Sequence, residues 1–540
     1  MDFPNILNHT ISKLTDQSSV TNLSKPDLIL YNGRIYPDAK SRSRFEAMAV
    51  WKGRVTDIGS SQEILKLRAR ATTTINLRGK TVLPGFCDSH IHLLSYGMLL
   101  RTLDLSKTRS IEEMNRQVAK RASLMKPDEW ILGRGWDDEK LREHRYPEKH
   151  DLDHSTSNPV FLKRVCGHVA VANSKALSLS GIDSDTPEPE GGVVLRDSRG
   201  APNGVLKERA LELVELAVPQ SMKEIKKSLV LAARRLARLG LTSLHCIVND
   251  ANELKALQEL KREREIPQSI YAIVPVKLLD QLVSLGLSTQ RGEEAFRIGG
   301  VKLYLDGSLG ARTAALTSPY NDNPVSNGML TMSREELKRV AMTSSEGGFQ
   351  LCIHAIGDRA VELAIQIIEE VFGPLKCRKF RHRIEHASLV SGKSILKMGK
   401  LGIIASVQPR FIYSDSWAEE RLGASRMHSL YPFASMTQEG ILLTAGSDCP
   451  VEDPNPFEGV WSATARPGLE GRKRLTVSQA LAAYTVNASF ASFCEESRGA
   501  LVPGNIADIV VLDRDPFECS PEALRQTRVI KTIIAGSVFA

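Results

Sequence analysis

After residue 80 the chain alternates eight short apolar runs with segments of helical periodicity. One helical segment, Lys223–Leu239, has an apolar face and ends before a glycine, and two others begin with the capping boxes Ser333-x-x-Glu336 and Thr476-x-x-Gln479. Such alternation is typical of parallel βα units, so eight of them predict an α/β fold, the (β/α)8 or TIM barrel. The eight predicted barrel strands are Thr81–His92, Leu241–Val248, Ser269–Val276, Gly299–Leu305, Phe349–His354, Arg381–Ala387, Gly402–Gln408 and Ile441–Ser447.

The first two predicted barrel strands are separated by nearly 150 residues. Ordinary βα connections are much shorter, so we expect a folded insertion over about residues 100–235 after the first strand. Because active sites of such barrels lie at the end where the strands terminate, the insertion is expected to fold over the barrel mouth. Residues 81–498, less the insertion, then correspond to an ordinary barrel.

The two ends of the chain resemble each other and differ from the middle. Asp27–Gly59 and Gly504–Val538 both contain short strand patterns separated by tight turns, and neither is long enough to bury a core alone. We therefore predict that residues 27–80 and 499–540 combine into one β-sandwich domain. Residues 1–26, rich in Ser, Thr and Asn and without an apolar core segment, are predicted to be a disordered tail without a secretory signal.

The composition argues against several functional classes. The net charge of +8 is spread over 540 residues, and the basic patches are short and lack interleaved aromatics, which argues against nucleic-acid binding. No apolar run is long enough for a membrane span. The eight cysteines contain no C-x-x-C pair, which indicates neither a disulfide framework nor a cysteine-type zinc site and favours a cytoplasmic location. The composition leaves the formation of a homo-oligomer open.

Metal-binding residue types recur where the predicted strands end. His90-x-His92 places two imidazoles on one face of the first strand, although such a pair taken alone is more often accidental. The fifth strand ends at His354, the sixth at His386 and the eighth at Asp448. Potential metal ligands thus stand at four strand ends, on the rim where barrel enzymes carry their active sites. The alternative, that each residue is a structural histidine or a helix cap, would have to hold independently at all four.

The motifs at these positions resemble the amidohydrolase superfamily, in particular the metal-dependent branch that contains N-substituted formamide deformylase. The resemblance extends from about Asp27 to Val538, and in that family a β-sandwich built from both termini flanks the barrel. It implies a hydrolase that uses water activated by one or two divalent cations, with zinc expected, to cleave a C–N bond. The motifs that carry it are LPGFCDSHIH (83–92), GHVAVANSKAL (167–177), VKLYLDGSLGARTAAL (301–316), HAIGDRAV (354–361), RIEHA (383–387) and AGSDCPV (445–451).

The resemblance also implies a role for each candidate ligand. His90 and His92 would bind the more buried cation, and His354 and His386 the more exposed one. Asp448 would bind a metal and act as the general acid and base. Lys302, on the fourth strand, would be carbamylated and bridge two cations; an unmodified lysine that ends the strand or binds substrate is the alternative.

Other residues near the predicted rim are candidates for substrate contact. His168 falls in the insertion and is either a substrate contact or a structural histidine. Asp306 and Arg312 follow the fourth strand, where they bind substrate or form a salt bridge with each other that shapes the loop. Gln408 and Arg410 follow the seventh strand. Asp88 and Glu385, each adjacent to a ligand in sequence, are candidates to orient the imidazoles.

The resemblance therefore implies a small-molecule hydrolase acting on a non-peptide amide, such as an N-substituted formamide, a cyclic amide or an acylated amine. A non-catalytic regulatory or scaffolding protein on the same fold is the alternative, because some relatives of this kind have lost metal ligands. The complete ligand set favours an enzyme. No G-x-S-x-G motif is present, which argues against a serine hydrolase of the α/β type.

Overall fold

The computed structural model describes residues 25–40, 43–219, 221–465 and 474–539. The predicted tail over residues 1–26 lies almost entirely outside the described residues. The chain forms two compact units: one continues from the N-terminal region to Ser95 and resumes at Ala232, and the other is the insertion, Tyr96–Leu231. Within the described ranges, no helix combines the length and the apolar character needed to cross a bilayer.

Eight parallel strands form the barrel in the order in which they occur along the chain. The first and eighth strands are joined just beyond their ends, where the Asp448 amide donates to the His90 carbonyl (2.8 Å) and the His92 amide to the Cys449 carbonyl (3.0 Å). The predicted TIM barrel is therefore confirmed. Its strands are β7 (Phe86–Ile91), β14 (Leu241–Ile247), β15 (Ser269–Pro275), β17 (Phe296–Tyr304), β18 (Leu351–Ala355), β19 (Arg383–His386), β20 (Ile404–Val407) and β21 (Leu443–Ala445).

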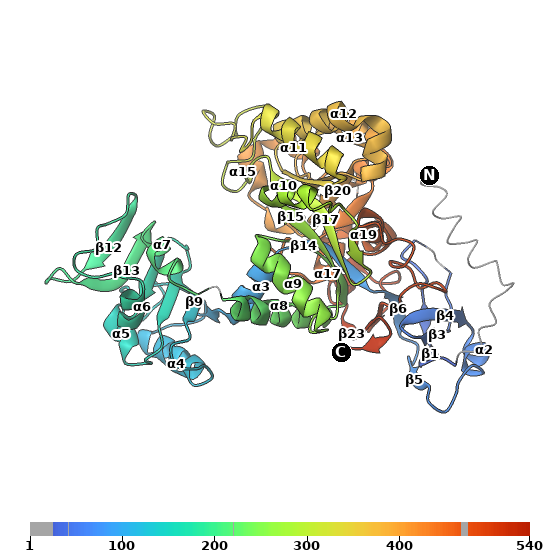
Figure 1. Ribbon diagram of the computed structural model, residues 1–540, viewed down its shortest axis with the longest axis horizontal. Coiled ribbons are helices and arrows are strands. Elements are labelled where there is room, and N and C mark those ends of the chain that lie inside the picture. The colour runs from blue at the N-terminus through green and yellow to red at the C-terminus, as the bar shows by residue number, and fades with distance from the viewer. Residues whose placement is uncertain (1–24, 41–42, 220, 466–473, 540) are drawn as a thin grey trace. The chain divides into compact units, whose positions relative to one another are not determined.

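Helices connect successive barrel strands and lie around the barrel in Figure 1. The predicted capping boxes at Ser333 and Thr476 are both formed, so these two hydroxyls satisfy amides that the first helical turn leaves unpaired. The helices are α9 (Ala251–Arg262), α10 (Leu279–Ser284), α11 (Arg334–Gly347), α12 (Asp358–Phe380), α13 (Gly392–Leu401), α14 (Phe411–Ser414), α15 (Ala418–Leu422), α16 (Phe433–Gln438), α17 (Pro456–Ala465), α18 (Val477–Ala483) and α19 (Val486–Ala491), with 3-10 turns η1 (Val276–Leu278) and η2 (Ala424–Ser429).

Both ends of the chain contribute to one β-sandwich beside the barrel. One sheet has the order β4-β3-β1-β5 and the other β2-β6-β22-β23-β24. Leu30 and Met48 of the first sheet share a buried core with Val82, Ile509 and Ile533 of the second. The elements are β1 (Leu28–Tyr31), β2 (Arg34–Ile35), β3 (Ala47–Trp51), β4 (Arg54–Gly59), α2 (Ser61–Leu65), β5 (Thr73–Asn76), β6 (Thr81–Pro84), β22 (Ile509–Leu512), α20 (Pro521–Arg525), β23 (Val529–Ile534) and β24 (Ser537–Val538).

The predicted first barrel strand, Thr81–His92, is two strands. Its first part, β6, belongs to the sandwich and pairs with β22, and only β7 enters the barrel. The chain changes sheet at Gly85, whose amide donates to the Asp508 carbonyl (2.8 Å). A β-carbon at Gly85 would lie 2.3 Å from the Thr242 side chain, so only glycine fits this crossing. The pair Pro84-Gly85, which favours a turn, stands at this break and was the available signal.

The insertion has its own sheet, in the order β12-β13-β11-β10-β9-β8, and its own core around the fully buried Trp136. The Trp136 ring nitrogen donates to the Leu162 carbonyl (2.8 Å), so the indole is satisfied inside that core.

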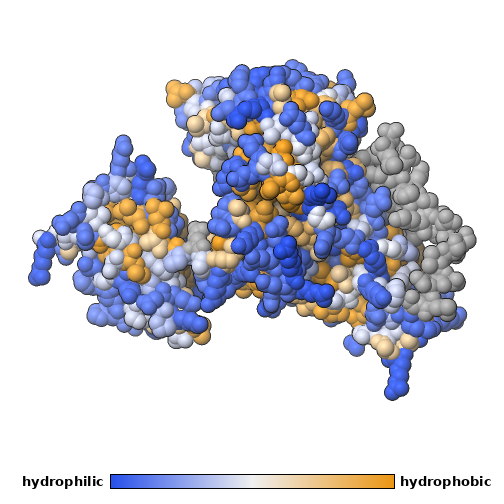
Figure 2. Space-filling model, in the orientation of Figure 1, coloured by the Kyte–Doolittle hydropathy of each residue, from blue (hydrophilic) through white to orange (hydrophobic). Residues whose placement is uncertain are grey.

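In the view of Figure 2 the exterior of both units is largely hydrophilic, with apolar side chains gathered in limited patches. That the insertion covers the barrel mouth stays a prediction. Its strands are β8 (Leu103–Asp104), β9 (Ile131–Trp136), β10 (Val160–Arg164), β11 (Val169–Ala172), β12 (Gly192–Arg196) and β13 (Pro202–Glu208), and its helices α4 (Ile111–Ala122), α5 (Lys149–Asp153), α6 (Ser174–Leu179) and α7 (Leu211–Glu215); α3 (Leu93–Arg101) and α8 (Met222–Ala237) connect it in sequence to the barrel strands.

Candidate metal centre

The ends of the first and eighth barrel strands bring three potential ligands together. His90 is fully buried and His92 is partly exposed. The Oδ1 atom of Asp448 lies 3.4 Å from Nε2 of His90 and 3.2 Å from Nε2 of His92. The three ligand atoms all lie within 4.8 Å of one another, a spacing that one cation could bridge.

Strands β18 and β19 add two more imidazoles beside these three side chains. The ring centroids of His354 and His386 are 4.4 Å apart, and those of His386 and His90 are 4.9 Å apart. His386 and Asp448 both adopt a positive φ, 73° and 55°, which residues other than glycine rarely do. Such backbone strain persists where the surrounding structure requires it, and it concentrates at functional sites.

Hydrogen bonds fix which nitrogen carries the proton in three of these four imidazoles. Nδ1 of His90 lies 2.5 Å from a carboxylate oxygen of Glu385, and Nδ1 of His386 lies 2.7 Å from Oε1 of Gln408. Nε2 of His354 lies 3.0 Å from the carbonyl oxygen of Gly307. Because these partners only accept, each ring donates to them and keeps a lone pair on its other nitrogen for a cation.

Burial keeps these imidazoles neutral. Desolvation, followed by the nearby Lys302, lowers the pKa of His354 to about 3 and that of His90 well below its ordinary value. The pKa of His386 is also lowered well below its ordinary value, first by burial and then by the neighbouring histidines. A neutral imidazole is the form that binds a cation, so the rings are in the required state at pH 7.

Lys302 lies on β17 between these groups. Its side chain is almost completely buried, and its Nζ lies 3.4 Å from Nε2 of His90 and 4.9 Å from the ring centroid of Tyr304. Burial lowers the pKa of Lys302, which favours the neutral amine. Imidazole nitrogens and a carboxylate oxygen suit zinc and other divalent transition metals, so the donor set fits such a cation.

The sequence of this chain also matches a known protein family. Residues 73–540 match the model of the amidohydrolase family. The chain belongs to the amidohydrolase family. The resemblance inferred from the motifs is thus confirmed, and so are the α/β class and the barrel with its terminal β-sandwich.

Three curated relatives of this amidohydrolase align along almost its whole length. The putative amidohydrolase YtcJ of Bacillus subtilis is 32% identical, with 94% of this chain and 98% of the relative covered. The Arabidopsis thaliana protein LONG AFTER FAR-RED 3 is 32% identical, with 94% and 90% covered. The N-substituted formamide deformylase of Arthrobacter pascens is 26% identical, with 94% and 97% covered.

A solved structure also matches this amidohydrolase. It is an uncharacterised metal-dependent hydrolase from Pyrococcus furiosus, 34% identical, with a TM-score of 0.79 over 91% of this chain and 100% of that chain. The family and this neighbour together support a hydrolase that requires a divalent metal.

Gln408 and Arg410, predicted to face the substrate, have protein partners in the amidohydrolase. Gln408 is buried and accepts the hydrogen bond from His386 described above. Arg410 forms ion pairs with Glu452 and Glu458, the first at 3.3 Å. Gln408 is therefore placed to orient a ligand. Substrate contact by either residue stays a prediction.

The proposed salt bridge between Asp306 and Arg312 is wrong. Arg312 pairs with Asp322 at 2.7 Å. Asp306 is buried and accepts hydrogen bonds from the backbone amides of Ala315, Ile356 and Gly357, at 2.8–3.0 Å. These bonds tie the loop after β17 to the end of β18, just beyond His354.

His168 lies in the insertion, exposed, with its Nδ1 atom 3.0 Å from a carboxylate oxygen of Glu208. A buried structural histidine, the alternative considered for this residue, is therefore wrong. Substrate contact by His168 stays a prediction.

Sequence reasoning missed two residues of the site. Tyr304 is half exposed, and its ring centroid is 5.3 Å from that of His354. Its position two residues after Lys302, on the same face of β17, was the available signal. Arg383 is fully buried and binds Glu385, and its place in the RIEHA motif, on the same face of the strand as Glu385, was the available signal.

Proposed function

We propose that this amidohydrolase cleaves a C–N bond of a non-peptide amide, with an N-substituted formamide, a cyclic amide or an acylated amine as the candidate substrate class. The observation that carries the proposal is the convergence of His90, His92, His386 and Asp448 at one end of the barrel, with Lys302 and His354 beside them. The similarity to an N-substituted formamide deformylase supports the formamide among these classes.

The chain's own residues would hold the cation in two groups. His90, His92 and Asp448 form the first group, and His354 and His386 form the second. A divalent cation bound there would supply Lewis-acid chemistry, which polarises a carbonyl group and makes water more acidic. We propose zinc, because imidazole and carboxylate ligands suit it.

Asp448 is the proposed general base and acid. Its carboxylate accepts the proton that water loses as it attacks the amide carbon, and later delivers that proton to the leaving nitrogen. An open-chain amide then yields a carboxylic acid (formic acid for a formamide) and an amine, and a cyclic amide yields one molecule that carries both groups. Asp448 suits this role because its carboxylate is 12% exposed at the end of β21, within reach of solvent and of both β7 histidines.

Lys302 is the proposed bridge between two cations. Only a neutral amine reacts with CO2, and burial has moved Lys302 toward that form. The resulting carbamate is anionic and supplies two oxygens. Asp306, Arg312, Gln408 and Arg410 around the barrel end, and His168 of the insertion, remain the proposed sources of substrate contact.

Metal analysis together with a substrate screen tests this function. We expect the purified chain to contain one or two equivalents of a divalent metal and to release formate from at least one N-substituted formamide, or amine from another amide of the screen. His150→Ala is the control for substitutions of the ligand histidines, and it should keep both metal and activity. Its side chain is 72% exposed and lies outside the ligand set. A chain that binds metal and these amides tightly without turnover would support the regulatory alternative.

A further inference from the structure

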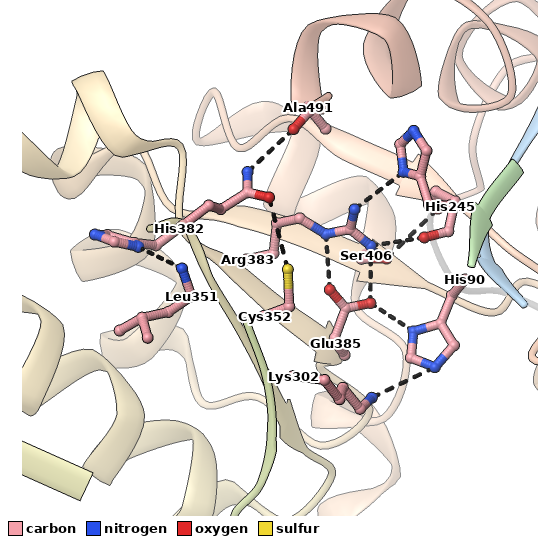
Figure 3. A network of polar contacts seen from close by, with 12 residues as sticks. His90, His245, Lys302, Leu351, Cys352, His382, Arg383, Glu385, Ser406 and Ala491 are labelled. Atoms are coloured by element: carbon pink, nitrogen blue, oxygen red, sulfur yellow. Dashed lines mark hydrogen bonds and ion pairs between the residues drawn. The ribbon is translucent and has the colours of Figure 1, made fainter. Parts of the chain in front are cut away.

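One buried arginine joins its own strand to three other strands in the barrel interior. Arg383 of β19 donates from Nη1 to Nδ1 of His245 on β14 (3.0 Å). From Nη2 it donates to the Ser89 carbonyl on β7 (2.7 Å) and to Oγ of Ser406 on β20 (2.8 Å). Figure 3 shows this guanidinium at the centre of the network. Because arginine only donates, His245 must accept here through an unprotonated nitrogen.

The same guanidinium holds both oxygens of one carboxylate. Nε of Arg383 lies 2.7 Å from Oε1 of Glu385, and Nη2 lies 3.0 Å from Oε2. Both side chains are fully buried. This two-point contact fixes the plane of the carboxylate as well as its position, which a lysine ammonium cannot do.

The carboxylate in turn holds His90. Its Oε2 atom accepts from Nδ1 of His90 at 2.5 Å, on the side of the ring opposite to Nε2 (Figure 3). The Nε2 atom is the one that faces Lys302 and Asp448, at 3.4 Å each. The chain of contacts therefore runs from Arg383 through Glu385 to the ring nitrogen that would bind the cation.

We propose that Arg383 is a positioning residue that sets the tautomer and the direction of His90 through Glu385, and so determines the metal affinity of the buried half of the site. The inference rests on the proposed function only in taking His90 as a metal ligand. The role of Arg383 depends on the shape of its guanidinium group, which contacts both oxygens of Glu385, and not on its charge alone. Arg383 would act through Glu385 and not as a ligand, because a guanidinium only donates.

The test compares Arg383→Lys with Arg381→Lys in the full-length chain. Arg381, two residues earlier, makes the same kind of two-point contact with Glu495 (3.0 and 2.6 Å), away from the ligand histidines, and is the matched control. Zn²⁺ affinity is measured by titration of metal-free protein against a competing chelator. The denaturation midpoint of the metal-free protein separates loss of folding from loss of binding.

We expect Arg383→Lys to weaken the tighter Zn²⁺ site about 10- to 100-fold, the usual effect of losing a partner of a ligand histidine, and Arg381→Lys to leave it unchanged. Glu385→Gln should weaken the same site to a similar extent, because an amide has only one acceptor oxygen and cannot accept from Arg383 at both of its terminal atoms. This variant carries the test if Arg383→Lys does not fold. The double variant should bind no more weakly than the worse single one, because both changes break one chain of contacts.

Wild-type Zn²⁺ affinity in a folded Arg383→Lys variant, or equal losses in the Arg381→Lys control, would overturn the inference while leaving the proposed function intact. A wild-type chain that binds no Zn²⁺ would overturn the proposed function and the inference together.

Discussion

The Oε1 atom of Gln408 lies 2.7 Å from Nδ1 of His386, and both side chains are buried. Gln408 is the last residue of the predicted seventh strand, and His386 ends the sixth, so neighbouring strands supply the ligand and the group that orients it. With the Glu385–His90 contact, two of the ligand histidines are each held by a side chain from within the barrel.

Gln408→Met should weaken metal binding at His386 about 10-fold or more, because the thioether cannot accept the Nδ1 proton well and the ring is freed to rotate. Gln408→Glu should retain binding, since a carboxylate oxygen accepts the same proton. Calorimetric Zn²⁺ titration of both variants checks this. Equal losses in the two variants would show that the contact is only packing.

His90→Ala or His92→Ala should abolish hydrolysis and lower the metal content, while the barrel remains folded. Each change removes an imidazole whose Nε2 faces Asp448. Metal analysis and circular dichroism of the variants provide the measurement. Full activity in either variant would invalidate the site.

Lys302→Ala should lose nearly all activity, and a short carboxylic acid in solution should partly restore it by supplying the missing oxygens. Metal-free protein reconstituted with bicarbonate should take up two cations, and protein reconstituted without bicarbonate should take up one. Two cations under both conditions, with an unmodified amine at Lys302, would rule out the carbamate and leave hydrolysis by His90, His92 and Asp448.

Glu253→Gln should stabilise the protein above neutral pH. Glu253 is buried at the start of α9, and burial raises its pKa to about 7, from an ordinary value of 4.5. A carboxyl group whose pKa is higher in the folded than in the unfolded protein stabilises the folded state. That stabilisation is complete below the unfolded pKa and is lost as the pH rises through the folded pKa, about 7 here. The glutamine cannot ionise.

The free energy of unfolding of Glu253→Gln, minus that of the wild type, should therefore grow by on the order of 3 kcal/mol between pH 4.5 and pH 8. Urea denaturation at both pH values measures this difference. A difference that does not change with pH would mean that Glu253 stays ionised in the folded protein.

Much of the barrel follows from the sequence because each strand is a short apolar run between helices with clear caps. The eight predicted strands each contain or overlap one barrel strand, and the ligand types stand out because parallel strands end at one rim. The error at Gly85 arose because strand residues stand on both sides of Pro84-Gly85, and the sequence does not show that they belong to different sheets.

Side-chain partners were less predictable than strand positions. The sequence placed Gln408, Asp306 and Arg312 near the rim of the barrel. It did not identify the hydrogen-bond partners that lie within 3 Å of these side chains. Gln408 orients His386, and Asp306 binds backbone amides contributed by two segments of the chain. Such pairings depend on side-chain directions fixed by the closed barrel, and no local pattern encodes them.

The pairing of β6 with β22 has a consequence for synthesis of the chain. Val82 pairs with Val511, so the sandwich sheet cannot be completed until the segment that carries β22 has left the ribosome. Until then β6 presents an unpaired edge that other nascent chains could join. Because β6 runs directly into β7 through Gly85, a chain that stops before β22 would also leave the strand that carries His90 without its anchor.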